Sequence, residues 1–262
     1  MTGRVVFVGA GPGAADLITL RGARALAQAD VVLFDALTDP ALRDWAPDAR
    51  WIDVGKRGFT DSTAQMRIDA LLVRHARAGA TVVRLKGGDP SVFGRLEEEL
   101  AALAVAGVEC EVVPGVTAAL AAAAAAKLPL TRRGRGRSVS FATAMTRCGA
   151  LPDGRRHADT EVYYMAGRQL GTLARRLQAA GWTGDTEVAV VSDAGGPRAL
   201  ASTHRLSALA QAALLHAGRP AVVVVGVGAG AVGVEDGAAA AASPPSPGCE
   251  QARPSSVQTP AA

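Results

Sequence analysis

Short, continuous apolar runs alternate with helical patterns along the first half of this chain, and no other feature restricts its fold as strongly. We expect buried strands at residues 4–8, 31–34, 81–85 and 108–113. The spacing of apolar residues predicts helices at residues 17–28, 63–77, 96–106 and 116–126. Continuous apolar strands separated by helices are typical of a mostly parallel sheet that helices cover on both faces. The pattern therefore predicts an α/β protein.

A second set of elements follows the segment at residues 129–137, PLTRRGRGR, which interrupts the first pattern with proline, glycine and arginine. Strands are expected at residues 138–142, 161–165, 187–191 and 221–227, and helices at residues 169–180 and 206–216. We therefore predict two α/β domains, at residues 1–127 and 128–234. Residues 235–262 are rich in alanine, serine and proline, a composition that predicts a disordered tail.

The composition narrows the class of protein. With 49% hydrophobic and 20% charged residues the chain can bury a core, while 4% aromatic residues argues against an aromatic platform for nucleic acid. The net charge of +4 would also suit a polycarboxylate substrate. Cys110, Cys148 and Cys249 form no CxxC pair, and no run of 18 apolar residues is free of charge. We expect a cytoplasmic protein without a metal, nucleic-acid or membrane partner.

A glycine-rich turn, GAGPGA at residues 9–14, follows the first expected strand. Its spacing fits the dinucleotide pattern GxGxxG/A, and Asp35 ends the second strand, where an NAD enzyme keeps a ribose-binding acid. A nicotinamide- or flavin-dependent oxidoreductase is therefore one alternative, and a plain strand-to-helix turn is another. Pro12 argues against the oxidoreductase because it removes a main-chain N–H from the turn that would hold a pyrophosphate.

A second glycine loop follows the strand at residues 81–85 and reads Lys86-Gly87-Gly88-Asp89-Pro90. Its glycines allow a ligand to touch the main chain, and the Asp89 carboxylate suits the ammonium, sulfonium and ribose hydroxyls of S-adenosylmethionine. Pro90 is expected to begin a helix, so Asp89 as a simple helix cap is an equally weighted alternative.

Seven motifs occur in an order that resembles the tetrapyrrole (precorrin) methyltransferase family, and within it the branch that methylates uroporphyrinogen III. They are GAGPG at 9–13, FDAL at 34–37, GKR at 55–57, RLKGGDP at 84–90, VFGR at 92–95, VPGVTA at 113–118 and PLT at 129–131. The resemblance covers about residues 4 to 227. It implies two α/β domains of the tetrapyrrole methylase type, with the active site in the cleft between them, and a homodimer.

The same resemblance implies a reaction and a methyl donor. Two methyl groups would pass from two S-adenosylmethionine molecules to ring carbons of uroporphyrinogen III, giving precorrin-2 for sirohaem and cobalamin synthesis. The implied contacts of S-adenosylmethionine are Pro12, Gly87, Gly88, Asp89, Val92, Thr117, Ala118, Met165, Ala194 and Ala221.

The resemblance also implies acid–base residues and substrate contacts. Asp35 would be the base that removes a proton after methyl transfer, and Lys56 the proton donor or charge partner. Their alternatives are a turn cap for Asp35 and a solvated loop lysine for Lys56. Because uroporphyrinogen carries carboxylates that arginine forks bind well, we expect Arg57, Arg132 and Arg133 to clamp the substrate.

The chain departs from the family pattern at Ala14, Ser91, Leu96-Glu97 and residues 143–145, Thr-Ala-Met. Several of these positions lie on the substrate side of the implied site. Three further alternatives therefore stay open: a methyltransferase acting on another precorrin, one acting on a non-tetrapyrrole substrate, and a cofactor-binding paralogue without activity.

Overall fold

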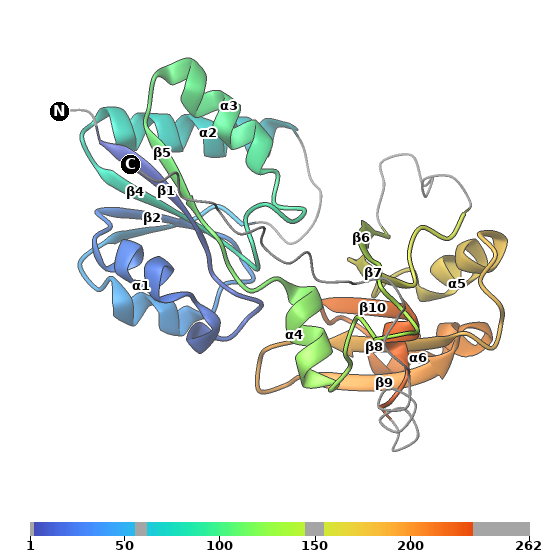
Figure 1. Cartoon of the computed structure of the whole chain (residues 1–262). Helices are drawn as coiled ribbons and strands as arrows, with labels where there is room; N and C mark the ends of the chain where they lie inside the picture. Colours follow the sequence, from blue (N-terminus) through green and yellow to red (C-terminus); the bar gives the residue numbers. More distant parts are fainter. Residues whose placement is uncertain (1–2, 56–61, 145–154, 233–262) are drawn as a thin grey trace, which may run out of the picture. The chain divides into compact units, whose positions relative to one another are not determined.

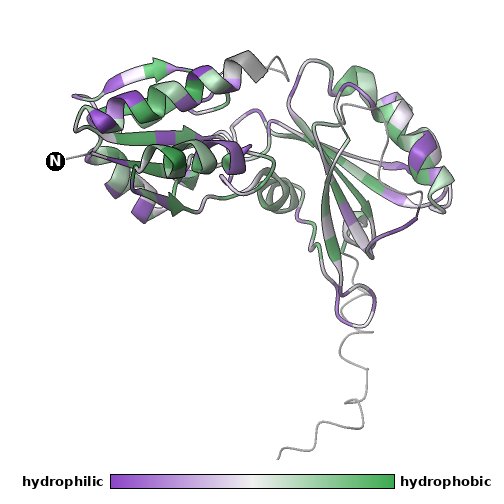
Figure 2. Ribbon diagram, turned by 90° about the horizontal axis from the view of Figure 1, so that it is seen from above, coloured by the Kyte–Doolittle hydropathy of each residue, from purple (hydrophilic) through white to green (hydrophobic). Residues whose placement is uncertain are grey.

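The computed structural model describes residues 3–55, 62–144 and 155–232 of the chain, without the side chains of 62–64. Within the compact unit that ends at Ala231, the strands form two five-stranded sheets, which confirms the predicted α/β class. The hydrophobic residues lie along the strands, and hydrophilic residues occupy many helical positions (Figure 2). The predicted tail at 235–262 lies outside the described residues, and the domain boundaries at 127/128 and 234/235 remain predictions.

The first sheet is entirely parallel, as the apolar runs predicted (Figure 1). Its strands are β1 Arg4–Gly9, β2 Val31–Phe34, β3 Arg50–Asp53, β4 Thr81–Lys86 and β5 Cys110–Val113, in the order β3-β2-β4-β1-β5. The edge strand β3 was not predicted, because its sequence RWID has no continuous apolar run and none of its residues is fully buried.

Helices cover both faces of this sheet. One face carries the 3-10 helices η1 Ala15–Leu17 and η2 Pro40–Trp45 with α1 Leu20–Ala27, and the other carries α2 Ser62–Arg77 with α3 Leu96–Ala106. Successive strand residues alternate between these faces: Val83 and Leu85 pack on the α1 side, whereas Val82 packs on the α2–α3 side. By the same alternation, Arg84 and Lys86 of β4 point toward α2 and α3.

The second sheet is mixed, and its strand directions were not predicted. It contains β6 Val139–Thr143, β7 Thr160–Tyr164, β8 Glu187–Ser192, β9 Leu200–Arg205 and β10 Ala221–Gly226, in the order β6-β7-β10-β8-β9. Only β6 and β7 pair in parallel. The apolar runs of β8 and β10 do not reveal strand direction, because both faces of these strands are buried, as in a parallel sheet.

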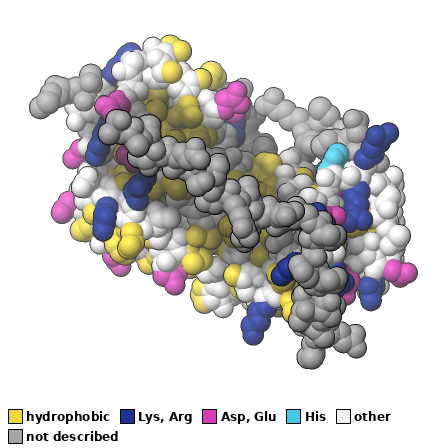
Figure 3. All heavy atoms as spheres, in the orientation of Figure 1, with side chains coloured by type: hydrophobic (Ala, Val, Ile, Leu, Met, Phe, Trp, Pro, Cys, Tyr) yellow, Lys and Arg dark blue, Asp and Glu magenta, His cyan; other side chains and the backbone are white. Residues whose placement is uncertain are grey.

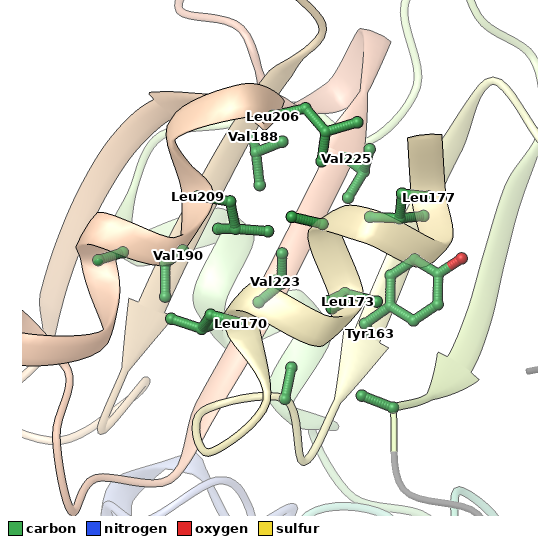
Figure 4. Close-up of a cluster of buried hydrophobic side chains, with 14 of the residues drawn as sticks. Tyr163, Leu170, Leu173, Leu177, Val188, Val190, Leu206, Leu209, Val223 and Val225 are labelled. Carbon is green, nitrogen blue, oxygen red and sulfur yellow. The ribbon is translucent and has the colours of Figure 1, made fainter. Parts of the chain in front are cut away.

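One face of the second sheet packs against α5 Leu170–Ala179, the 3-10 helix η3 Leu206–Gln211 and the short α6 Ala212–Leu215. Figure 4 shows Leu170, Leu173 and Leu177 of α5 among the valines of β8 and β10. The predicted single helix at 206–216 is wrong. Its buried residues Leu206, Leu209 and Ala212 recur every three positions, which is the period of a 3-10 helix.

The opposite face of the second sheet is covered by α4 Ala118–Ala125, a helix built almost entirely of alanine, beside the 3-10 turn η4 Val227–Ala229. Small side chains let the helix approach the strands closely, and Ala119 and Ala122 are fully buried there. On the molecular face in Figure 3, charged side chains of both signs are dispersed among the described residues and do not gather in one patch.

Candidate active site

The two glycine loops lie side by side at the carboxyl ends of β1 and β4. Their main chains pair directly: Gly88 N–H donates to Gly11 O (2.7 Å), Gly11 N–H donates to Gly88 O (3.3 Å), and Ala10 N–H donates to Lys86 O (2.8 Å). Ligands of open α/β sheets bind outside the carboxyl ends of the strands. The two motifs that the sequence singled out separately therefore form one surface.

The main chain of both loops is open to a ligand. A Cβ atom added at Gly13 would meet no atom within 4 Å, and one at Gly87 or Gly88 would meet nothing closer than 3.5 Å and 3.9 Å. Gly11, Gly13 and Gly88 have φ of +77°, +125° and +73°, a region that favours glycine. This cradle fits a ligand that lies flat against peptide groups, as S-adenosylmethionine would.

Asp89 is held by main-chain amides through both carboxylate oxygens. Oδ1 accepts from Ser91 N–H (2.8 Å) and Oδ2 accepts from Gly115 N–H (2.9 Å), which links the second loop to the segment after β5. Asp89 is therefore a cap, as the alternative held, but it caps a turn and not a helix. The prediction that Pro90 begins a helix is wrong: α3 begins at Leu96, and Phe93, at φ +53°, cannot continue a helix. Each Asp89 oxygen retains a lone pair for a ligand.

Thr117 and Ala118 begin α4, and Tyr164 fixes this beginning. The Tyr164 hydroxyl lies 2.7 Å from Thr117 Oγ1 and accepts from Ala119 N–H at 3.2 Å. Burial raises the pKa of Tyr164, so its phenol stays neutral. Val92, half-buried in the turn before α3, packs against the apolar cluster that contains Ala119 and Tyr164.

Three further predicted cofactor contacts, Met165, Ala194 and Ala221, lie at strand ends of the second sheet. Met165 follows β7 with φ +57°, and Ala194 is buried in the turn after β8. A Cβ at Gly195 in this turn would lie 2.6 Å from Pro12 Cγ, so the turn touches the first glycine loop. Ala221 pairs with Ser192, at the base of the same turn. A bulky residue at φ > 0 is strained and often marks a functional position.

Asp35 lies just after β2, with its side chain 30% exposed, and Arg84 Nη2 donates to its Oδ1 at 2.6 Å. A Cβ at Gly55 would lie 2.9 Å from Asp35 Cα, so the GKR motif begins against this residue. Lys56 and Arg57, the two residues that follow, lie outside the described part of the chain.

The two described arginines of the expected substrate clamp differ in their surroundings. Arg132 donates from its guanidinium to the main-chain oxygens of Gly230 and, at 3.4 Å, Ala231. Arg133 is exposed. Arg132 therefore has a structural task near β10, and clamping by either arginine remains a prediction.

An aromatic group that the sequence analysis did not identify lies beside Met165. The ring of Tyr164 is 5.0 Å from that of Phe93 and 5.9 Å from that of Phe141, centroid to centroid. Phe93 and Phe141 are 43% and 41% exposed, although both are large and apolar. The only sequence signal was Phe93 within the VFGR motif.

Among residues 3–55, 62–144 and 155–232, no three His, Cys, Asp or Glu side chains form a metal-binding group. Within that part of the chain, no helix has both the length and the apolar character needed to span a bilayer.

A family model for tetrapyrrole (corrin/porphyrin) methylases matches residues 4–210. The chain belongs to this family. This methylase is 45% identical over 197 residues to a uroporphyrinogen-III C-methyltransferase of Pseudomonas aeruginosa, a match that covers 74% of the chain and 80% of that protein. It is also 45% identical over 231 residues to a siroheme synthase of Actinobacillus succinogenes. That match covers 86% of the methylase but only 48% of the synthase, so the chain spans about half of that relative.

Solved structures agree with this assignment. The native uroporphyrin-III C-methyltransferase of Thermus thermophilus has a TM-score of 0.75 and 38% identity, covering 86% of the methylase and 98% of that chain. The Thermus enzyme has also been solved in complex with S-adenyl homocysteine, with a TM-score of 0.74. A cobalt precorrin-4 methyltransferase follows at a TM-score of 0.76 and 29% identity, covering 87% of the methylase and 96% of that chain.

Proposed function

We propose that this methylase transfers methyl groups from S-adenosylmethionine to uroporphyrinogen III and produces precorrin-2 in two successive transfers. The similarity to the P. aeruginosa uroporphyrinogen-III C-methyltransferase carries the proposal, because it covers 80% of that enzyme at 45% identity. The second glycine loop supports it independently, because it pairs with the first loop and carries Asp89, and the dinucleotide pattern of an oxidoreductase accounts for the first loop alone.

S-adenosylmethionine supplies a methyl group on a sulfonium, and the protein must hold it and keep it dry. Peptide groups of Gly87 and Gly88 would lie under the donor, and the free lone pairs of Asp89 would face its positive groups. The wall of the donor site near α4 and β7 would be formed by Thr117, Ala118 and Met165. Pro12, Val92, Ala194 and Ala221 complete the proposed set.

Asp35 would accept the proton that leaves the methylated ring. Its Oδ1 accepts from Arg84, and no other side-chain donor is found on either oxygen among the described residues. Oδ2, which does not contact the guanidinium, would take the proton. Lys56 would donate a proton or balance charge, and Arg57, Arg132 and Arg133 would bind substrate carboxylates.

The test is anaerobic incubation of the protein with labelled S-adenosylmethionine and uroporphyrinogen III. We expect two labels per tetrapyrrole and the absorption spectrum of precorrin-2 or its oxidised form. Tight binding of S-adenosylhomocysteine without incorporation would indicate an inactive paralogue. Labelling of a later precorrin in place of uroporphyrinogen III would indicate a different acceptor.

We also propose that the methylase works in the cytoplasm as a homodimer, with its active site between two α/β domains. An exposed free thiol at Cys110 suits a reducing compartment. Light scattering at micromolar concentration tests the oligomeric state, and a monomer that is fully active would contradict the dimer.

A further inference from the structure

A buried glutamate binds both basic side chains of β4. Glu99, on α3, is fully buried; its Oε1 accepts from Arg84 Nε (3.0 Å) and its Oε2 accepts from Lys86 Nζ (2.6 Å). Arg84 and Lys86 are each 3% exposed. Because they are two positions apart in one strand, both point toward α3, and one carboxylate can span them.

Arg84 extends this network to the carboxyl end of the neighbouring strand β2. Its Nη1 donates to the carbonyl oxygens of Leu85 (3.2 Å) and Leu33 (3.3 Å), and its Nη2 donates to Asp35 Oδ1 at 2.6 Å. Three contacts of the guanidinium are thus made to Glu99 and to two main-chain carbonyl groups of the sheet. Its fourth contact is the carboxylate that we propose as the proton acceptor.

The network is balanced in charge, with two carboxylates and two cations. Gln65 of α2 also reaches Glu99 Oε1, at 3.4 Å, and Asp69 faces Gln65 from the same helix. Burial and the neighbouring Arg84 lower the pKa of Lys86, whereas Asp35 and Glu99 outweigh burial and raise the pKa of Arg84. An uncompensated charge at this depth would be costly, so Arg84 needs Glu99 in order to stay beneath Asp35.

We infer that Arg84 and Glu99 are positioning residues for Asp35: Glu99 fixes the guanidinium of Arg84, and Arg84 fixes the Asp35 carboxylate so that Oδ2 is presented to the substrate. Neither residue would touch the substrate or the methyl donor. This inference rests on the proposed function, in which Asp35 takes the proton.

The experiment compares Glu99→Gln, Arg84→Lys and Asp35→Asn, alone and combined, in steady-state methyl transfer. Lysine keeps the charge of Arg84 but cannot bind Asp35 and Glu99 together. We expect Glu99→Gln and Arg84→Lys to lower kcat by about 10- to 100-fold, the size of effect that misplacing a reacting group produces. In Arg84→Lys, KM for uroporphyrinogen III and Kd for S-adenosylhomocysteine should stay within about twofold of the wild type, because Lys86 keeps its 2.6 Å contact with Glu99 beside the glycine loop.

The double variants separate positioning from a general loss of structure. If Glu99 acts through Arg84 on Asp35, adding Glu99→Gln to Asp35→Asn should cause almost no further loss of kcat. Glu161→Gln is the matched control, since Glu161 is a 1% exposed carboxylate of the second sheet that binds Tyr163 and Trp182. It should leave kcat near the wild-type value at a temperature where it is folded.

Two outcomes would overturn the inference while leaving the proposed function intact. One is a slow Asp35→Asn enzyme with normal kcat in both Glu99→Gln and Arg84→Lys. The other is a full, multiplicative loss when the substitutions are combined. A normal kcat in Asp35→Asn would instead contradict the proposed role of Asp35 itself. Because Arg84→Lys preserves the buried charge, it stays informative if Glu99→Gln does not fold.

Discussion

The hydroxyl of Tyr164 lies 2.7 Å from Oγ1 of Thr117, so the end of β7 is joined to the first turn of α4 by side chains that are both buried. The same hydroxyl accepts the N–H of Ala119 at 3.2 Å. One phenol thus satisfies an orphan amide at the beginning of a helix and fixes Thr117, which we expect to contact the methyl donor.

Tyr164→Phe should weaken the binding of S-adenosylhomocysteine as well as the fold. Loss of the hydroxyl leaves the Ala119 amide without its acceptor, and we expect the free energy of unfolding to fall by about 1–3 kcal/mol. Denaturant unfolding and calorimetric titration measure the two effects. Tyr163→Phe is the control: it removes a 2.6 Å hydrogen bond to Glu161 and should cost stability without changing the affinity. Equal losses of affinity in both variants would contradict this prediction.

Gly115→Ala should disrupt the meeting point of three loops. A Cβ at Gly115 would lie 2.7 Å from Gly9 Cα and even closer to the carbonyl oxygen of Gly88, and backbone atoms there cannot rotate away. We expect a loss of about 1–3 kcal/mol of stability and of most binding of S-adenosylhomocysteine. Gly184→Ala, whose Cβ would lie 3.5 Å from its nearest neighbour, Ser207 Cβ, should change stability by less than about 0.5 kcal/mol.

Asp89→Asn tests whether the carboxylate serves only as a cap. An amide has one acceptor oxygen, so it cannot accept from both Ser91 and Gly115, and stability should fall by about 1–2 kcal/mol. If Asp89 also faces the positive groups of the donor, the affinity for S-adenosylmethionine should fall by more than about tenfold.

Asp159→Asn serves as the control, because the Asp159 carboxylate also accepts main-chain amides, from Arg137 and Ser138. It should leave donor affinity unchanged. A similar result for Asp89→Asn would leave Asp89 as a turn cap alone.

The stability of the fold should fall in mild acid through His216. This buried imidazole lies 2.8 Å from the hydroxyls of Ser192 and Ser202, and burial, followed by the charges of His204 and Arg219, lowers its pKa from 6.5. Since the unfolded chain takes up the proton first, the contribution of His216 is complete above about pH 6.5 and is lost as pH falls toward the lower pKa of the folded state.

The measurement is the melting temperature between about pH 7.5 and pH 5. His216→Gln should flatten the decrease seen in the wild type. His75 acts in the same direction, because burial lowers its pKa too, so part of the slope should remain.

The sequence was most informative where strands are buried on both faces. The runs at β1, β2, β4 and β10 predicted those strands correctly. The edge strand β9, LASTHR, was missed because it alternates partly buried and exposed residues and contains only one large apolar side chain. Strand direction in the second sheet could not be read from composition, since burial on both faces gives parallel and antiparallel strands the same apolar pattern.

The glycine loops and their ligand class could be predicted from short motifs, because a close approach to the main chain restricts residue type locally. The charge network could not be predicted, because Glu99 of α3 and Arg84 of β4 meet only when the helix packs on the sheet. A signal was nevertheless present: two cations, Arg84 and Lys86, alternate within an apolar strand, and a buried pair on one face requires an acid from the helix that covers it.

The strand order of the first sheet has a consequence for synthesis on the ribosome. β1 pairs only with β4 and β5 among the described strands, so its apolar segment Val5–Val8 has no hydrogen-bonding partner until Thr81 and the residues after it have been translated. During that interval the nascent chain exposes an unpaired hydrophobic strand, a state prone to aggregation. We therefore expect the yield of folded protein in cells to fall when translation between β1 and β4 is slowed, because the unpaired strand is then exposed for longer.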